Sequence, residues 1–133
     1  MSESGKKRIL VVDDEPDIVV IEQVALEEAG YEVSSANNGE ECLKMVAASP
    51  PDLIVLDVQM PGKPGFFVLQ QLRENLETRA IPVIMVTGVG ERLGISFSKK
   101  DMYDYLGHEP EVYLEKPVRP EALQQAAAKL LGS

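Results

Sequence analysis

Short runs of apolar residues alternate along the chain with longer segments in which apolar residues recur every three or four positions. Runs of the first kind are typical of strands buried on both faces, and segments of the second kind are typical of helices that cover a sheet. This alternation predicts βαβ units and a parallel sheet. We expect its strands at Ile9–Val12, Glu32–Ser35, Leu53–Leu56, Val83–Val86 and Val112–Leu114.

Helix signals lie between and after these strands. Pro16 suits the first turn of a helix, and Gly30 suits the position just beyond its end. Asn38 and Glu41 have the spacing of a capping box, and Pro50 stops the helix that they begin. We expect apolar positions at Ile18, Ile21, Val24 and Ala25 of the first helix, and two further helices over Gly65–Asn75 and Pro120–Leu131.

The segment between the fourth and fifth strands is harder to predict. It begins with Gly88, Gly90 and Gly94, which do not favour a helix. Ser98 with Asp101 could cap a helix that ends near Gly107. We expect this fourth crossover to be enlarged, with an irregular conformation as the alternative to a helix.

Composition places the chain among folded soluble domains. It has 133 residues, of which 44% are apolar and 26% are charged. Its 22 acidic and 13 basic side chains give a net charge of -9, which argues against contact with nucleic acid or an anionic membrane surface. No apolar run approaches the ~20 residues of a spanning helix. We expect a tail over residues 1–7 and one domain over residues 8–133.

The only cysteine, Cys42, excludes an internal disulfide. No histidine or second cysteine stands at ligand spacing from it, which argues against a zinc site. Its place in the second predicted helix is typical of a small buried hydrophobe. These features favour a cytoplasmic protein.

Polar residues follow the predicted strands at the points where each strand ends. Asp13–Glu15 follow the first strand, Asp57 follows the third, Thr87 follows the fourth and Lys116 follows the fifth. Ligands of open parallel sheets bind beyond the carboxyl ends of the strands. We therefore expect these side chains to form one site.

Carboxylates that are brought together repel one another unless a divalent cation neutralises them. An all-oxygen set favours Mg²⁺, with Asp14 and Asp57 as direct ligands and Asp13 acting through water. An acidic pair before Pro16 is also consistent with a simple helix cap supported by the helix dipole. The residues themselves leave both interpretations open.

Asp57 ends a strongly apolar strand, where a charge without a function would be unusual. A carboxylate in this place can act as a nucleophile toward phosphorus and form an aspartyl phosphate. Lys116 would then hold phosphoryl oxygens as a point charge, and the Thr87 hydroxyl would donate a hydrogen bond to another oxygen.

Taken together, these motifs resemble the receiver domain of bacterial two-component response regulators. The resemblance is carried by residues 11–15 (Val-Val-Asp-Asp-Glu), residues 56–62 (Leu-Asp-Val-Gln-Met-Pro-Gly), Thr87 and Lys116-Pro117, and it covers nearly the whole chain. It implies a doubly wound five-stranded α/β fold with the flavodoxin-like strand order 2-1-3-4-5 and helices on both faces.

The resemblance also implies a function. Asp57 would accept a phosphoryl group from a histidine kinase or phosphotransfer protein, and Thr87 and Lys116 would contact it. Mg²⁺ would be held by Asp13, Asp14 and Asp57 with the backbone carbonyl of Gln59. The protein would catalyse only its own phosphorylation and dephosphorylation, and would not be an enzyme in the wider sense.

Tyr113 matches the switch aromatic of this family. Phosphorylation would draw Thr87 inward, Tyr113 would follow, and the surface near the fourth and fifth strands would change its affinity for a downstream protein or output domain. The chain departs from the family at Pro64, at Gly88 and in the long segment after Thr87. The last departure predicts an altered partner surface.

Three alternatives remain open. A degenerate receiver would bind partners without phosphorylation. An Asp-nucleophile phosphatase of the haloacid dehalogenase type would need a second aspartate two residues after Asp57, where Gln59 stands. A flavodoxin-like nucleotide binder would need a glycine-rich or hydroxyl-rich loop in place of Asp13–Glu15.

Overall fold

The computed structural model describes residues 5–60, 62, 64–87 and 110–132. These residues form a five-stranded sheet in the order β2-β1-β3-β4-β5, in which every neighbouring pair is parallel. The expected doubly wound α/β fold is therefore confirmed. The strands are β1 (Arg8–Val12), β2 (Glu32–Ala36), β3 (Leu53–Asp57), β4 (Val83–Thr87) and β5 (Val112–Glu115).

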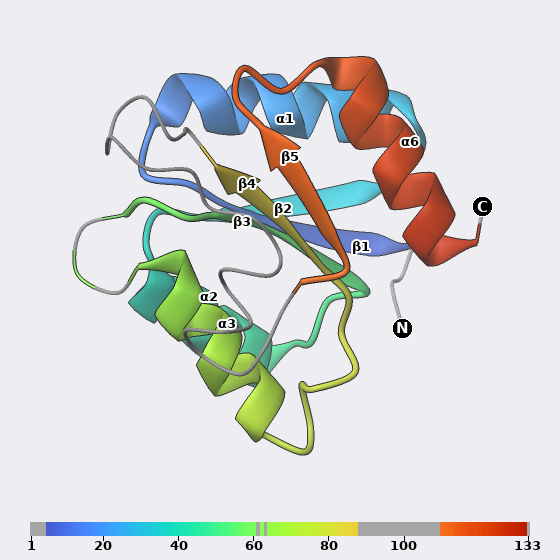
Figure 1. The fold of residues 1–133 in the computed structure, drawn as a ribbon. Helices are drawn as coiled ribbons and strands as arrows, with labels where there is room; N and C mark the ends of the chain where they lie inside the picture. The colour runs from blue at the N-terminus through green and yellow to red at the C-terminus, as the bar shows by residue number, and fades with distance from the viewer. Residues whose placement is uncertain (1–4, 61, 63, 88–109, 133) are drawn as a thin grey trace.

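Helices cover both faces of the sheet (Figure 1). The helices are α1 (Pro16–Glu28), α2 (Gly39–Ala48), α3 (Gly65–Glu74) and α6 (Pro120–Leu131). One face carries α1 and α6, and the other carries α2 and α3. The predicted helix between Ser98 and Gly107, like the rest of the fourth crossover, lies outside the described residues.

Side chains of each strand alternate between the two helical layers, as the strand period of two requires. In β1, Ile9 and Val11 belong to the core under α1 and α6, whereas Leu10 and Val12 belong to the core under α2 and α3. Strands β3 and β4 show the same alternation. This alternation decides which layer each functional side chain faces at the strand ends.

The predicted helix boundaries hold to within a residue or two. Asn38 caps α2 by accepting a hydrogen bond from the Glu41 amide at 2.8 Å. The Glu41 carboxylate reaches the amide of Asn37 at 2.6 Å, one residue before the position expected for a capping box. Gly30 follows α1 with a φ of +100°, a conformation in which a glycine is favoured.

The apolar side expected for α1 is partly wrong. Ile21 and Val24 are 50% and 47% exposed, whereas the buried residues of the helix are Val19, Glu22, Ala25 and Leu26. Four consecutive apolar residues, 18–21, surround the helix on all sides, so hydrophobicity alone did not identify the inner face. The true inner face includes a glutamate.

Candidate functional site

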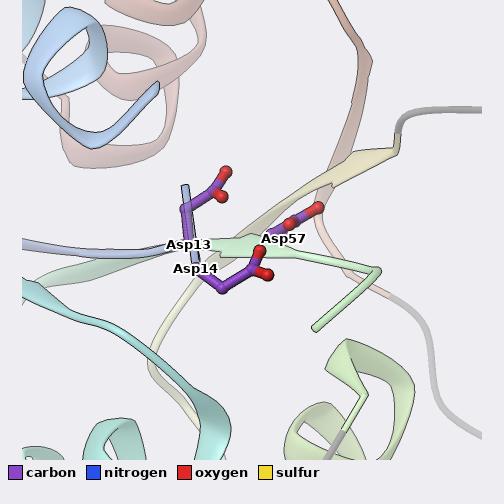
Figure 2. A group of neighbouring side chains, drawn as sticks. All are labelled: Asp13, Asp14 and Asp57. Atoms are coloured by element: carbon purple, nitrogen blue, oxygen red, sulfur yellow. The ribbon is translucent and has the colours of Figure 1, made fainter. Parts of the chain in front are cut away.

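The aspartates of the candidate site come from neighbouring strands. Val12 of β1 is in register with Leu56 of β3, so Asp13 and Asp14 follow β1 beside Asp57, the last residue of β3. One carboxylate oxygen from each aspartate lies within 4.8 Å of the others (Figure 2). The structure therefore brings together the three aspartates that the sequence singled out.

The carboxylates approach one another from different sides of the sheet edge. Asp13 continues the alternation of Ile9 and Val11 toward α1, and Asp14 points away to the other side (Figure 2). Asp13 and Asp57 are only 1% and 2% exposed, whereas Asp14 is exposed. The site thus has a buried interior and one solvent-facing ligand.

Lys116 provides the positive charge of this group. Its Nζ lies 3.3 Å from Asp13 Oδ2, 3.4 Å from Asp57 Oδ1 and 3.4 Å from Glu15 Oε1. The Lys116 amide donates to the Thr87 carbonyl at 2.8 Å, which ties this loop to the end of β4. One ammonium group therefore faces the two buried aspartates and the more exposed Glu15.

Backbone amides orient two of the carboxylates. The Glu15 amide donates to Asp13 Oδ1 at 2.9 Å, and the Gln59 amide donates to Asp57 Oδ1 at 3.3 Å. The N-cap residue of α1 is Glu15, and its side chain makes no capping bond. Simple helix capping therefore does not account for the acidic pair at residues 13–14.

The electrostatics show an excess of buried negative charge. Burial raises the pKa of Asp57 to about 6, and the Asp13 carboxylate adds to the rise. Burial likewise raises the pKa of Asp13, against the opposing effects of the Glu15 amide and Lys116. Burial acts to lower the pKa of Lys116, but the Asp57 and Asp13 carboxylates outweigh it and leave that pKa raised.

This donor set suits a hard divalent cation. Three carboxylate oxygens lie close together, one aspartate is open to water, and burial raises the pKa of both buried aspartates, which disfavours their charged forms. Mg²⁺ binds oxygen ligands, retains several waters and offsets such repulsion. Gln59, the fourth expected ligand through its backbone carbonyl, follows Asp57 by two residues and has a buried side-chain oxygen without a hydrogen-bond partner among the described residues.

Thr87 and Tyr113 lie on the other side of the sheet from the buried charges. Thr87 ends β4 and is 6% exposed, and its side chain continues the alternation of Val83 and Met85 toward α2 and α3. Tyr113 is paired in register with Met85 and packs against the same core. The two residues expected to form the switch therefore share one face.

Comparison with known proteins assigns the family. A model of the response regulator receiver domain matches residues 9–128. The chain belongs to this family. Among curated proteins it is similar to the alkaline phosphatase synthesis transcriptional regulatory protein PhoP of Bacillus subtilis, with 37% identity over 129 residues that cover 94% of this chain and 48% of that protein.

Other receiver proteins match along nearly their whole length. Protein PilH of Pseudomonas aeruginosa is 35% identical over 125 residues, which cover 94% of this chain and 98% of that protein. The chemotaxis protein CheY4 of Vibrio cholerae has a TM-score of 0.81 at 30% identity, over 96% of this chain and all of that one (100%). The chain spans about half the length (48–50%) of the first curated relatives that it matches.

Gly65 is a residue of the receiver site that sequence reasoning missed. A Cβ atom at this position would lie 2.4 Å from the Asp57 carbonyl oxygen and 2.9 Å from the Val58 Cα. The Gly65 amide also donates to the Val58 carbonyl at 2.9 Å. The start of α3 thus packs directly against the backbone of Asp57, and only glycine fits there without a shift. The sequence signal was the glycine at the first position of a predicted helix.

Glu22 is the second residue that sequence reasoning missed. It is 3% exposed on the inner side of α1, the side that faces the same layer as Asp13 and Asp57. The available signal was a charge at a position three residues from Val19 and four from Leu26.

No helix in the described part of the chain combines the length and hydrophobicity that a bilayer crossing requires.

Proposed function

We propose that this receiver domain is a phosphoacceptor switch of a two-component phosphorelay, in which Asp57 takes a phosphoryl group from a histidine kinase or phosphotransfer protein. The observation that carries the proposal is the environment of Asp57. Its carboxylate is 2% exposed, lies 3.4 Å from the Lys116 ammonium and shares a 4.8 Å cluster with Asp13 and Asp14.

The chemistry of the transfer follows from these groups. An Asp57 oxygen forms a bond to phosphorus while the phosphorus–nitrogen bond of a phosphohistidine breaks, and the imidazole leaves with the bonding electrons. Lys116 stabilises the negative charge of the phosphoryl oxygens, and Thr87 donates a hydrogen bond to one of them. Asp13, Asp14, Asp57 and the Gln59 carbonyl would hold Mg²⁺, which would supply positive charge against the carboxylates and the phosphoryl oxygens.

The output of the switch is a changed partner surface. Thr87 and Tyr113 share the face covered by α2 and α3, so a hydroxyl drawn toward a phosphoryl group leaves space on the side of the tyrosine. Addition of beryllofluoride with Mg²⁺, which mimics the aspartyl phosphate, is expected to change the amide shifts around Tyr113. Unchanged shifts there would contradict the switch.

The proposed partners are a histidine kinase or phosphotransfer protein and a downstream protein or output domain. In this role the chain is a signalling switch in the cytoplasm that catalyses only its own phosphorylation and dephosphorylation. Relatives support two arrangements: PhoP is named a transcriptional regulatory protein and is matched over 48% of its length, whereas PilH is matched over 98%.

Intact-mass measurement after incubation with acetyl phosphate and Mg²⁺ tests the proposal. We expect one added phosphoryl group on the wild-type chain and none on Asp57→Asn. Asp52→Asn is the matched control, because Asp52 is an exposed aspartate beside the opposite end of the same strand, and it should be labelled like the wild type.

Two results would overturn the proposal. Absence of label on the wild type would favour a degenerate receiver that binds partners without phosphorylation. Undiminished label on Asp57→Asn would place the phosphoryl group on another residue. Omission of Mg²⁺, with a chelator added, should abolish labelling, and labelling that persists would remove the cation from the proposed role.

A further inference from the structure

Glu22 is a buried ionisable residue for which phosphoryl transfer has no use. Only 3% of it is exposed, and its Oε2 atom has no hydrogen-bond partner among the described residues. On α1 it stands between Val19 and Leu26, both members of the core under α1 and α6. A charged carboxylate in such a place destabilises the fold unless it takes up a proton or faces a positive charge.

Strand alternation shows what Glu22 faces. Ile9 and Val11 of β1 belong to the core under α1, so Asp13 continues on that side of the sheet. By the same period, Asp57 follows Val55 of β3 on that side, and Lys116 follows Leu114 of β5. The buried charges of the site therefore lie in the same layer as Glu22.

The elements packed against α1 are β1, β2 and α6, and Tyr31, which precedes β2, lies in the same core as Val19 and Leu26. Asp13 after β1 and Asp57 at the end of β3 contribute negative charge, and Lys116 after β5 contributes positive charge. Helix α6 buries only apolar residues against this layer: Leu123, Ala126 and Ala127. The charge that Glu22 experiences is therefore set by the acidic site.

We propose that Glu22 is a proton-linked sensor of the charge in the acidic site, holding a proton while the site lacks a divalent cation and releasing it when one binds. The idea rests on the proposed function only in its choice of Mg²⁺ as the cation. Removal of a negative charge from the site has the same effect as adding a cation, so the coupling exists without Mg²⁺.

The proton is already favoured in the metal-free protein. Burial raises the pKa of Glu22 to about 8, the Asp13 and Asp57 carboxylates add to the rise, and Lys116 opposes it. A divalent cation beside Asp13 and Asp57 offsets the negative charge that Glu22 faces. Linkage is reciprocal, so a midpoint that falls by about one pH unit corresponds to a cation affinity that rises about tenfold once the proton is lost.

Carbon-13 NMR of the glutamate side-chain carboxyl groups tests the proposal on the full chain. The Glu22 signal is identified as the one that disappears in Glu22→Gln. Its midpoint is followed from acid to alkaline pH in the metal-free protein, in saturating MgCl₂, and in metal-free Asp57→Asn. We expect the first midpoint to lie far above the ordinary glutamate range, and both other conditions to lower it.

Failure of the sensor proposal can be distinguished from failure of the proposed phosphoacceptor function. A Glu22 midpoint in the ordinary glutamate range, or the same high midpoint in all three samples, would overturn the sensor. If Mg²⁺ changes none of the site's aspartate signals, the cation assignment fails, and the Asp57→Asn sample still decides the coupling. Glu28→Gln, an exposed change on the same helix, should leave every Glu22 midpoint unchanged.

Discussion

The two faces of the sheet bury different chemistry. The face covered by α2 and α3 has an apolar core that runs from Leu10 through Leu69 to Met85. The face covered by α1 and α6 has a comparable core, but Asp13 and Asp57 are buried at its carboxyl edge and Glu22 is buried in the middle of α1. Both faces belong to the same five strands, so the difference comes from the residues and not from the architecture.

This difference assigns separate tasks to the two faces. Apolar packing on the α2 and α3 side contributes stability in proportion to the area removed from water. Buried carboxylates on the α1 side lose hydration and repel one another, which lowers stability. The charged face therefore holds a site whose energy depends on what binds there, and the apolar face supports it. Each prediction below sets one face against the other.

The largest effect is expected from a cavity in the apolar face. Leu69 of α3 is fully buried at 0% exposure, so Leu69→Ala should lower the free energy of unfolding by about 2–5 kcal/mol. Urea denaturation measures the loss. Leu76→Ala is the matched control, because Leu76 is 77% exposed and its truncation should change stability by less than about 0.5 kcal/mol. Equal losses in the two variants would contradict the assignment of the core.

A smaller loss is expected where the two faces meet. Gly65 begins α3 on the apolar side, yet a Cβ there would lie 2.4 Å from the Asp57 carbonyl oxygen. Gly65→Ala should therefore destabilise the fold by about 1–3 kcal/mol and displace Asp57, because the backbone must move to accept the methyl group. Urea denaturation and the rate of labelling by acetyl phosphate measure both effects. Wild-type values for both would show that the close approach places no constraint on the site.

On the charged face, removal of a buried charge should raise the free energy of unfolding instead of lowering it. The pKa of Glu22 is raised to about 8 from an ordinary 4.5, so the folded state binds its proton more tightly than the unfolded state. Stability from this group is therefore fully present below about pH 4.5 and falls as the pH rises through about 8. Glu22→Gln, which cannot ionise, should be more stable than the wild type by about 1–3 kcal/mol near pH 8 and nearly equal near pH 4.5.

Urea denaturation of both proteins across this pH range gives the difference that isolates Glu22. The subtraction removes those contributions of Asp13 and Asp57 that do not depend on Glu22; the pKa values of both aspartates are raised as well. Glu28→Gln should follow the wild-type curve because Glu28 is exposed. A Glu22→Gln variant that is less stable at every pH would mean that the carboxylate makes a favourable contact that the amide loses.

Most of the fold follows from local patterns in the chain. Apolar runs of three or four residues identify four of the five strands, and signals such as Asn38 and Gly30 identify helix ends, because these depend on neighbouring residues alone. The inner face of α1 could not be assigned in this way. Residues 18–21 are all apolar, so only packing against the sheet decides that Val19 is buried and that Ile21 is exposed.

The residues of the candidate site likewise divide into those that local patterns predict and those that depend on packing. The place of Asp13, Asp57 and Lys116 at the strand ends follows from the rule that parallel strands present their carboxyl ends at one edge. The structure brings an oxygen of each aspartate within 3.4 Å of the Lys116 ammonium group. Gly65 and Glu22 depend on how a helix packs on that edge. Such contacts join residues distant in the sequence, and no spacing rule encodes them.

The smallest predicted effect concerns Cys42 on the apolar face. It is 0% exposed on α2, and burial raises the pKa of its thiol to about 12. At neutral pH it is therefore a thiol and not a thiolate, and it should not react with a disulfide reagent until the protein unfolds. Absorbance from Ellman's reagent, recorded in buffer and then in urea, measures this.

Val24→Cys supplies the matched control on the charged face, because Val24 is 47% exposed on α1. In buffer this variant should release one equivalent of chromophore from the new cysteine, and in urea a second equivalent from Cys42. Rapid reaction of Cys42 in the folded wild-type protein would mean that α2 opens readily from the sheet. The core under α2 would then be reached by solvent without unfolding of the whole domain, in spite of its complete burial in the structure.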